Sequence, residues 1–285
     1  MTSPIAIIVF QTVRVTIIQL IGVLGIFFVL GYILAVLQKK TSALYQQAFG
    51  WRGILWTAII GTPVHEIGHV FFAKLFRHKI EHISLFTPNK ETGGLGHVDH
   101  SYKKSSIYQT VGNFFVGAAP LIFGIAVITL LIYVLLPTGK DLLATHISAR
   151  ESLWSTITTF PHTLTLLFKK ANLVTWQFWI FLYISFAIST HIAPSKQDRK
   201  GMWKGFFWII LILFFINLAA IFLKTDITTY ILRTAVYMHV LISVTLLALL
   251  MSVLHYGCAT LILSPLRLLT KQKIEVPPYD EGKNI

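Results

Sequence analysis

Long apolar stretches separated by short polar connections constrain this chain more than any other feature of its sequence. An α-helix needs about 20 apolar residues to cross the hydrocarbon core of a bilayer. Hydrophobic residues make up 55% of the chain and charged residues only 12%, which excludes a water-soluble globular protein. We therefore predict an all-α polytopic membrane protein with about six transmembrane helices. The predicted spans cover residues 15–37, 51–76, 107–136, 173–193, 203–223 and 230–263.

The charge distribution bears on partners and orientation. Lys and Arg outnumber Asp and Glu by 24 to 11, which gives a net charge of +13. The basic residues are scattered over the polar connections rather than gathered with aromatic residues on one polar domain, so no nucleic-acid partner is expected. They are more frequent on one side of the six-helix arrangement, and the positive-inside rule then places both termini in the cytoplasm.

The second predicted span contains an H-E-x-x-H motif at residues 65–69. Positions i and i+4 of a helix share one face, so His65 and His69 can bind one metal ion together. Glu66 would lie beside that ion, where it could take a proton from a metal-bound water during peptide hydrolysis. In soluble helices the motif sometimes only decorates a solvated face, but an ionisable group at membrane depth is by default functional. We interpret the motif as part of a zinc site.

A zinc site of this kind needs a third protein ligand and keeps its fourth position for water. Among the 11 Asp and Glu residues, Asp198 directly follows the predicted fourth span. Pro194 would end that helix, and Gly201 would permit an unusual turn. Asp198 is therefore the candidate ligand. The alternative is a loop carboxylate that only balances its basic neighbours.

The polar connection after the motif has a pattern typical of a β-hairpin. Residues 80–86 alternate apolar and polar side chains, a Gly-Gly pair follows, and residues 95–102 resume the pattern. The edge of such a small sheet could bind an extended peptide by strand addition. The alternative is that residues 90–94 form only a mobile loop. His97 and His100 lie in this connection and are the histidines best placed to replace a predicted ligand.

The third predicted span begins with small and polar residues. Gly112, Gly117 and Gly124 allow helices to approach closely in lipid, so packing explains them without chemistry. Asn113 leaves two interpretations open. An amide in hydrocarbon needs a partner, so it either bonds to a neighbouring helix or supports the scissile carbonyl and its oxyanion beside the metal.

Taken together, these features resemble the site-2 protease family of intramembrane zinc metalloproteases, over residues 51–201. The resemblance rests on the motif within an apolar span, the Gly- and Asn-containing third span, and the Pro-then-Asp-then-Gly segment that closes a later span. It implies zinc held by His65, His69 and Asp198, with Glu66 as general base. It also implies a membrane-associated sheet after the metal helix and catalysis on the cytoplasmic side.

The late segment departs from the family pattern at two positions and in its Pro-to-Asp spacing, which is one residue shorter. The chain has His191 where Asn is usual, and Arg199 directly follows the aspartate. His191 could approach the metal or a substrate carbonyl, or it could cap the carbonyl groups at a helix end.

The sequence therefore predicts three regions: an N-terminal transmembrane helix and loop (1–50), a catalytic membrane core of three helices and a hairpin (51–201), and two C-terminal transmembrane helices with a polar tail (202–285). We expect a zinc metalloendopeptidase that hydrolyses a peptide bond in or near a transmembrane segment of a membrane protein. One alternative is a protease similar to the prenyl-protein endopeptidases, which would need a downstream Glu-x-x-x-Asp pattern that the sequence lacks. The other is a non-proteolytic membrane protein that binds or transports metal.

Overall fold

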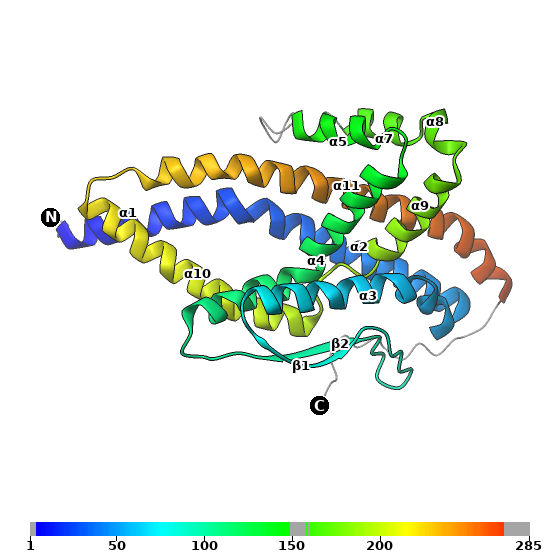
Figure 1. The fold of residues 1–285 in the computed structure, drawn as a ribbon, viewed down its shortest axis with the longest axis horizontal. Helices are drawn as coiled ribbons and strands as arrows, with labels where there is room; N and C mark the ends of the chain where they lie inside the picture. The colour runs from blue at the N-terminus through cyan, green and yellow to red at the C-terminus, as the bar shows by residue number, and fades with distance from the viewer. Residues whose placement is uncertain (1–3, 149–157, 159, 271–285) are drawn as a thin grey trace.

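The computed structural model describes residues 4–148, 158 and 160–270 as helices and one small sheet (Figure 1). The predicted polar tail after residue 270 lies outside the described residues. The first half contains α1 (Pro4–Leu20), the π-helical turn η1 (Ile21–Gly25), α2 (Ile26–Phe49), α3 (Trp51–Leu75), β1 (Lys79–Ser84), β2 (His97–Ser101) and α4 (Ile107–Leu135). The second half contains α5 (Gly139–Ser148), α7 (Phe160–Leu167), α8 (Lys170–Leu173), α9 (Trp176–Ser189), α10 (Lys196–Phe222) and α11 (Ile227–Thr270).

The number of predicted spans is not confirmed. Within the described residues, four helical segments are long and apolar enough to cross a membrane: Ile5–Phe49, Ile107–Leu135, Lys196–Phe222 and Ile242–Pro265. Helix α9 has 14 residues, fewer than the roughly 20 that a span needs. Helix α3 has 25 residues but does not reach the required apolarity, since Arg52, Lys74 and the charged motif lie within it. The prediction of a helical, membrane-type architecture is confirmed, whereas the count of about six spans is not confirmed within the described residues.

The first helical segment is longer than predicted. The helix continues from Pro4 to Phe49 through the π-helical turn, so the apolar residues before the predicted first span extend that span. The loop expected before α3 is a single residue, Gly50. Gly50 has φ of 64° and ψ of −153°, a backbone conformation that side chains other than glycine rarely adopt. This glycine lets the chain turn from α2 directly into the helix that carries the motif.

Helix α4 is the central packing element. It packs against α3, α9 and α10 and also contacts α11, while the long helices α2 and α11 lie side by side (Figure 1). The largest buried cluster combines apolar residues from several helices, including Leu34 of α2, Ile125 of α4, Phe178 of α9 and Leu247 of α11. Through α4, this core fixes α3 and the start of α10 relative to each other.

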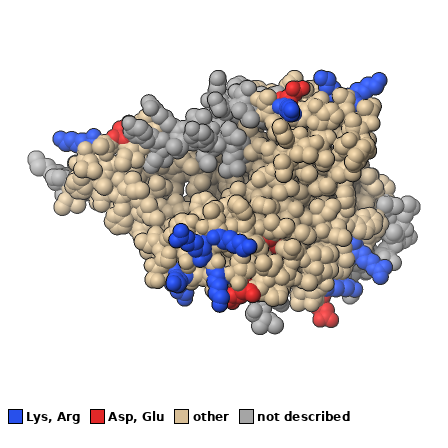
Figure 2. Space-filling model, viewed as in Figure 1, with Lys and Arg blue, Asp and Glu red and all other residues tan. Residues whose placement is uncertain are grey.

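The exterior is rich in large apolar side chains. Trp56 and Ile59 of α3, Leu130 of α4, Phe215 of α10 and Leu261 of α11 are each more than half exposed. In the view of Figure 2, charged side chains gather at the upper edge and along the lower part, with broad uncharged surface between them. Soluble monomers rarely expose so much contiguous apolar surface. Together with the four long apolar helices, the surface indicates a membrane protein.

The predicted hairpin is present as a two-stranded antiparallel sheet. Both strands are shorter than the alternating segments, because the pairing ends at Ser84 and begins again at His97. Backbone hydrogen bonds of 2.7 Å from Thr87 to Leu95 and of 2.8 Å from Asn89 to Gly94 close the connection. Residues 90–94 are therefore the turn of this hairpin.

Candidate metal centre

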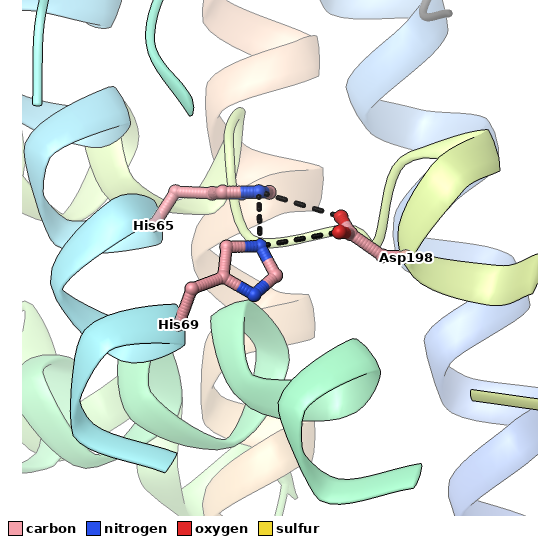
Figure 3. A group of neighbouring side chains, drawn as sticks. All are labelled: His65, His69 and Asp198. Atoms are coloured by element: carbon pink, nitrogen blue, oxygen red, sulfur yellow. Dashed lines mark hydrogen bonds and ion pairs between the residues drawn. The ribbon is translucent and has the colours of Figure 1, made fainter. Parts of the chain in front are cut away.

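Helix α3 brings the two motif histidines together. His65 and His69 are one helical turn apart, and their ring centroids are separated by 4.9 Å. Their Nε2 atoms are 3.2 Å apart (Figure 3). Both rings are largely buried, with side-chain exposures of 15% and 8%. The helical spacing thus aims two imidazole nitrogens at one point inside the protein.

Backbone carbonyl groups orient both rings. Nδ1 of His65 lies 2.6 Å from the carbonyl oxygen of His191, and Nδ1 of His69 lies 2.9 Å from that of Val116. A carbonyl oxygen only accepts hydrogen bonds, so each Nδ1 must carry the hydrogen and donate it. In the neutral rings each Nε2 then presents a free lone pair. Outer hydrogen bonds of this type fix the tautomer of metal-binding histidines.

Asp198 reaches the same point from the first turn of α10. Its carboxylate lies 3.5 Å from Nε2 of His65 through Oδ2 and 3.2 Å from Nε2 of His69 through Oδ1 (Figure 3). A capping box holds it there: the backbone N–H of Ser195 donates to Oδ2 at 2.8 Å, and the Ser195 hydroxyl accepts from the backbone N–H of Asp198. The carboxylate also benefits from the positive end of the helix dipole.

The prediction of an unusual turn at Gly201 is wrong. Gly201 lies within α10, which already begins at Lys196, and a side chain at this position would meet nothing within 4 Å. The non-helical backbone lies instead in the linker between Ser189 and Lys196, where Pro194 disfavours a continuous helix. Asp198 is therefore a helix-capping residue rather than a loop residue.

The spacing of the three groups fits a tetrahedral metal site. Zinc with bonds of roughly 2.0–2.1 Å to nitrogen and oxygen needs ligand atoms about 3.3 Å apart in a tetrahedron. The separations here are 3.2, 3.2 and 3.5 Å. Two nitrogen lone pairs and a carboxylate that converge in this way repel one another, and a shared cation removes that repulsion. The group can therefore hold a metal ion, with one tetrahedral position left for another ligand.

Close helix packing makes this convergence possible. A Cβ atom at Gly117 of α4 would lie 2.4 Å from the carbonyl oxygen of Asp198, and one at Gly61 of α3 would lie 2.4 Å from that of Ala187. Neither distance is tolerable for a real Cβ atom. Gly117 directly follows Val116, whose carbonyl group orients His69. The predicted packing role of Gly117 therefore acts at the metal centre itself.

Helix α2 supports the centre through a contact that the sequence did not suggest. The Gln38 side-chain oxygen accepts a hydrogen bond of 2.9 Å from the backbone N–H of Ala193. Ala193 lies in the linker between His191, whose carbonyl group orients His65, and the capping residue Ser195. Nothing local in the sequence marks Gln38, because its partner is 155 positions away.

Glu66 lies beneath the hairpin. The residue is 6% exposed. A Cβ atom at Gly96, the residue before β2, would lie 3.1 Å from Glu66 Cγ and 2.8 Å from the carbonyl oxygens of Ser84 and Leu85. The absence of a side chain at Gly96 thus lets the hairpin cover Glu66 closely.

Among the described residues, the side chains of the other candidate residues form no hydrogen bond or ion pair with the two motif histidines or Asp198. Asn113 is buried, and among the described contacts its amide donates to the Thr110 carbonyl oxygen at 3.2 Å, within its own helix. The ring nitrogens of His191 are buried without a hydrogen-bond partner among the described residues, so its carbonyl group rather than its ring contacts the centre. His100 pairs with His78 through their Nδ1 atoms at 3.1 Å, and His97 joins a separate group on the hairpin.

Comparison of the chain with protein-family models, curated proteins and solved structures finds no match.

Proposed function

We propose that the chain is an intramembrane zinc metalloendopeptidase that cleaves a peptide bond in or near a transmembrane segment of another membrane protein. The observation that carries this proposal is the convergence of two imidazole nitrogens and one carboxylate at tetrahedral spacing, beside a buried glutamate. Zinc is the proposed ion, because it favours four-coordinate sites built from imidazole and carboxylate.

His65, His69 and Asp198 would hold the zinc ion. When bound there, the ion supplies Lewis acidity, which lowers the pKa of water and polarises a carbonyl group. Glu66 removes a proton from the attacking water and delivers it to the amide nitrogen of the scissile bond as that bond breaks. The water oxygen ends in the new carboxylate and the nitrogen leaves as an amine. Burial of Glu66 under the hairpin limits competition from bulk water.

The hairpin is the proposed substrate-binding surface. A helical substrate must unwind first, because each of its carbonyl groups is shielded by its own hydrogen bond. Each strand of the two-stranded sheet has one edge without a strand neighbour among the described residues, where an extended peptide can add. Contact between Gly96 and Glu66 brings this sheet to the proposed general base.

For Asn113 we propose support of the scissile carbonyl. It lies one helical turn before Val116, on the face of α4 that accepts the hydrogen bond from His69. Its amide nitrogen carries a second hydrogen beyond the one donated to Thr110.

The orientation and the regions of the chain are part of the same proposal. The uneven Lys and Arg distribution supports placing both termini and the active site toward the cytoplasm. Residues 51–201 would form the catalytic core, since they carry the motif, the hairpin, Asn113 and Asp198.

The test uses purified full-length protein in lipid vesicles with a panel of single-span peptides that contain helix-breaking Gly or Pro residues. We expect cleavage that a zinc chelator blocks and added zinc restores. Glu66→Gln should keep its zinc by elemental analysis and lose roughly 100-fold or more of the cleavage rate. Glu91→Gln, at an exposed position in the hairpin turn, is the matched control and should cleave normally.

Unchanged cleavage by Glu66→Gln would remove the catalytic role of this residue. Tight zinc binding by the wild-type protein without cleavage of any peptide would favour the alternative of a metal-binding or metal-transport protein.

A further inference from the structure

A second group of two histidines and one aspartate lies on the hairpin, apart from the buried centre. His82 belongs to β1, and His97 and Asp99 belong to β2. One possible ligand atom from each residue lies within 4.8 Å of the other two. All three residues are exposed, so an ion and its water ligands have free access.

The strand register places all three side chains on one face of the sheet. His97 and Asp99 are two positions apart on β2, and successive side chains of a strand alternate between faces. His82 is paired directly with Asp99, while Ser84 is paired with His97. Cross-strand partners share a face, so His82 lies beside Asp99 and diagonal to His97.

A β-bulge produces this arrangement. Ile80 pairs with His100, and regular pairing would then place Glu81 opposite Asp99. The register shifts between Ile80 and His82, so a histidine replaces a second carboxylate opposite Asp99. Bulges commonly re-aim side chains near functional sites. Here the bulge exchanges a repulsive pair of like charges for a pair that can share a cation.

The side-chain geometry is close to that of a metal site. The rings of His82 and His97 are stacked with centroids 5.0 Å apart and an angle of 15° between their planes. Nε2 of His97 lies 3.9 Å from Oδ2 of Asp99. Ligand atoms on one zinc ion are about 3.3 Å apart, whereas those of the group lie within 4.8 Å of one another, so side-chain rotations that shorten each separation by at most about 1.5 Å close the site. Such rotations are easy at 44% and 59% side-chain exposure.

We propose that His82, His97 and Asp99 form a second binding site for a divalent transition-metal ion of the zinc type. The bound ion would cross-link β1 and β2 on the hairpin that covers Glu66. Gly96, next to His97, makes the contact with Glu66, so the ion would fix the hairpin in its place over the buried centre. The site requires no proteolytic activity, and its test measures binding only.

The two sites should differ in affinity. No backbone carbonyl group among the described residues orients the rings of His82 or His97, in contrast to the rings of the buried centre. Loss of one outer hydrogen-bond partner weakens a metal site by roughly 10- to 100-fold. We therefore expect the hairpin ion to bind about 100-fold or more weakly than the buried ion.

The experiment titrates metal-free, full-length protein in detergent with Zn²⁺ in competition with a chromophoric chelator. Wild-type protein should bind two equivalents, one tight and one weak. His82→Ala and His97→Ala should each lose the weak equivalent and keep the tight one, which also shows that the variants are folded. Asp198→Ala should lose the tight equivalent and keep the weak one. His162→Ala, at an exposed position of α7, is the control and should keep both.

A Co²⁺ titration supplies a second measurement, because its absorption bands report nitrogen ligation at each equivalent. A single wild-type equivalent that both hairpin variants retain would overturn the proposal, as would a weak equivalent that both of them retain. Neither result depends on whether the protein cleaves peptides, so failure of the hairpin site and failure of the protease function are distinguishable.

Discussion

The buried centre and the hairpin group offer the same ligand types, two imidazoles and one carboxylate, in two different settings. In the buried centre, carbonyl oxygens of His191 and Val116 orient the rings, and a capping box holds Asp198. In the hairpin, the rings only stack on each other and the aspartate lies 3.9 Å from the nearer histidine. The two groups therefore have the same ligand types but differ in the hydrogen bonds that hold those ligands in place.

The difference shows what a buried metal centre requires beyond its ligands. Burial of two imidazoles and a carboxylate in a helical bundle is costly unless each polar atom has a partner. Backbone groups of Val116, His191 and Ser195 supply partners for the two Nδ1 atoms and for Oδ2 of Asp198. The exposed hairpin group avoids this desolvation cost because water solvates it. Its ligands, however, are not held in the geometry that a metal ion needs. We therefore expect metal affinity to depend more on the hydrogen bonds that orient the ligands than on the number of ligands.

The largest expected effect is loss of the buried carboxylate. Asp198→Ala should abolish tight zinc binding, because only two histidines remain and the capping box loses the bond from the Ser195 backbone N–H to the carboxylate. We expect the affinity to fall by more than the roughly 100-fold that loss of an outer partner causes. Asp99→Ala, the matched change in the hairpin, should leave tight binding intact. Elemental analysis after dialysis against a weak chelator measures both, and full zinc occupancy in Asp198→Ala would move the third ligand elsewhere.

A smaller effect should follow from closing the space between α4 and α10. The Cβ atom of Gly117→Ala would lie 2.4 Å from the Asp198 carbonyl oxygen, so the start of α10 must shift away from the histidines. We expect a loss of zinc affinity of roughly 10- to 100-fold, as for other losses of ligand support. Gly201→Ala, one helical turn after Asp198, is the control, because its Cβ atom meets nothing within 4 Å. Chelator competition measures both variants, and equal affinities would show that α10 adapts without moving Asp198.

Loss of the contact from α2 should have a more modest effect. Gln38→Ala removes the acceptor for the Ala193 backbone N–H and leaves that buried donor without its partner. We expect zinc affinity to fall by roughly 10-fold, because the linker that orients both His65 and Asp198 becomes less fixed. Gln38→Glu keeps an acceptor oxygen and should retain most of the affinity. If both variants bind zinc like the wild type, the linker is held by its other contacts.

Local rules of the sequence predicted part of this molecule. Helix periodicity is enough to place His65 and His69 on one face, and alternation with a Gly-Gly pair is enough to predict the hairpin. The ends of the first helix were missed, because a π-helical turn and Gly50 allow the helix to run up to α3 without a loop. The count of about six spans is not confirmed, because the polar motif lowers the apolarity of α3 and α9 is short.

The support of the centre was beyond prediction because it depends on contacts between distant segments. The bonds from His65 to His191 and from Ala193 to Gln38 join residues 126 and 155 positions apart. Neither bond leaves a recognisable pattern in the sequence, because one partner in each is a backbone group that almost any residue could provide. The small residues of the third span did predict close helix packing, but which backbone would approach Gly117 followed only from the fold. The hairpin group was hidden because the bulge changes which residue faces Asp99.

The smallest expected effect concerns a pair of histidines that links the hairpin to α4. His78 donates from Nε2 to the Gln109 carbonyl oxygen at 2.8 Å, so its Nδ1 accepts from Nδ1 of His100. Burial, and then the neighbouring His78, lower the pKa of His100 to about 4, and burial also lowers the pKa of His78. The negative charges of Asp198 and, to a smaller extent, of Asp99 oppose the lowering of the His100 pKa. The closed hairpin therefore keeps both rings neutral at pH values where an opened hairpin would bind protons.

Because the opened state binds more protons below about pH 6.5, the stability of the closed hairpin is complete above that pH and decreases as the pH falls toward 4. We expect the opening equilibrium of β2 to rise by up to roughly tenfold at pH 5, less than the full shift allows because the ring is partly solvated. Hydrogen exchange of the β2 amides, corrected for the intrinsic rate at each pH, measures this change. His100→Phe should remove most of the pH dependence, and exchange that is independent of pH in the wild type would show that the pair does not hold the hairpin. Since the face with His82 and Asp99 is exposed, zinc bound there should slow the same exchange, so one measurement separates the contributions of the two faces.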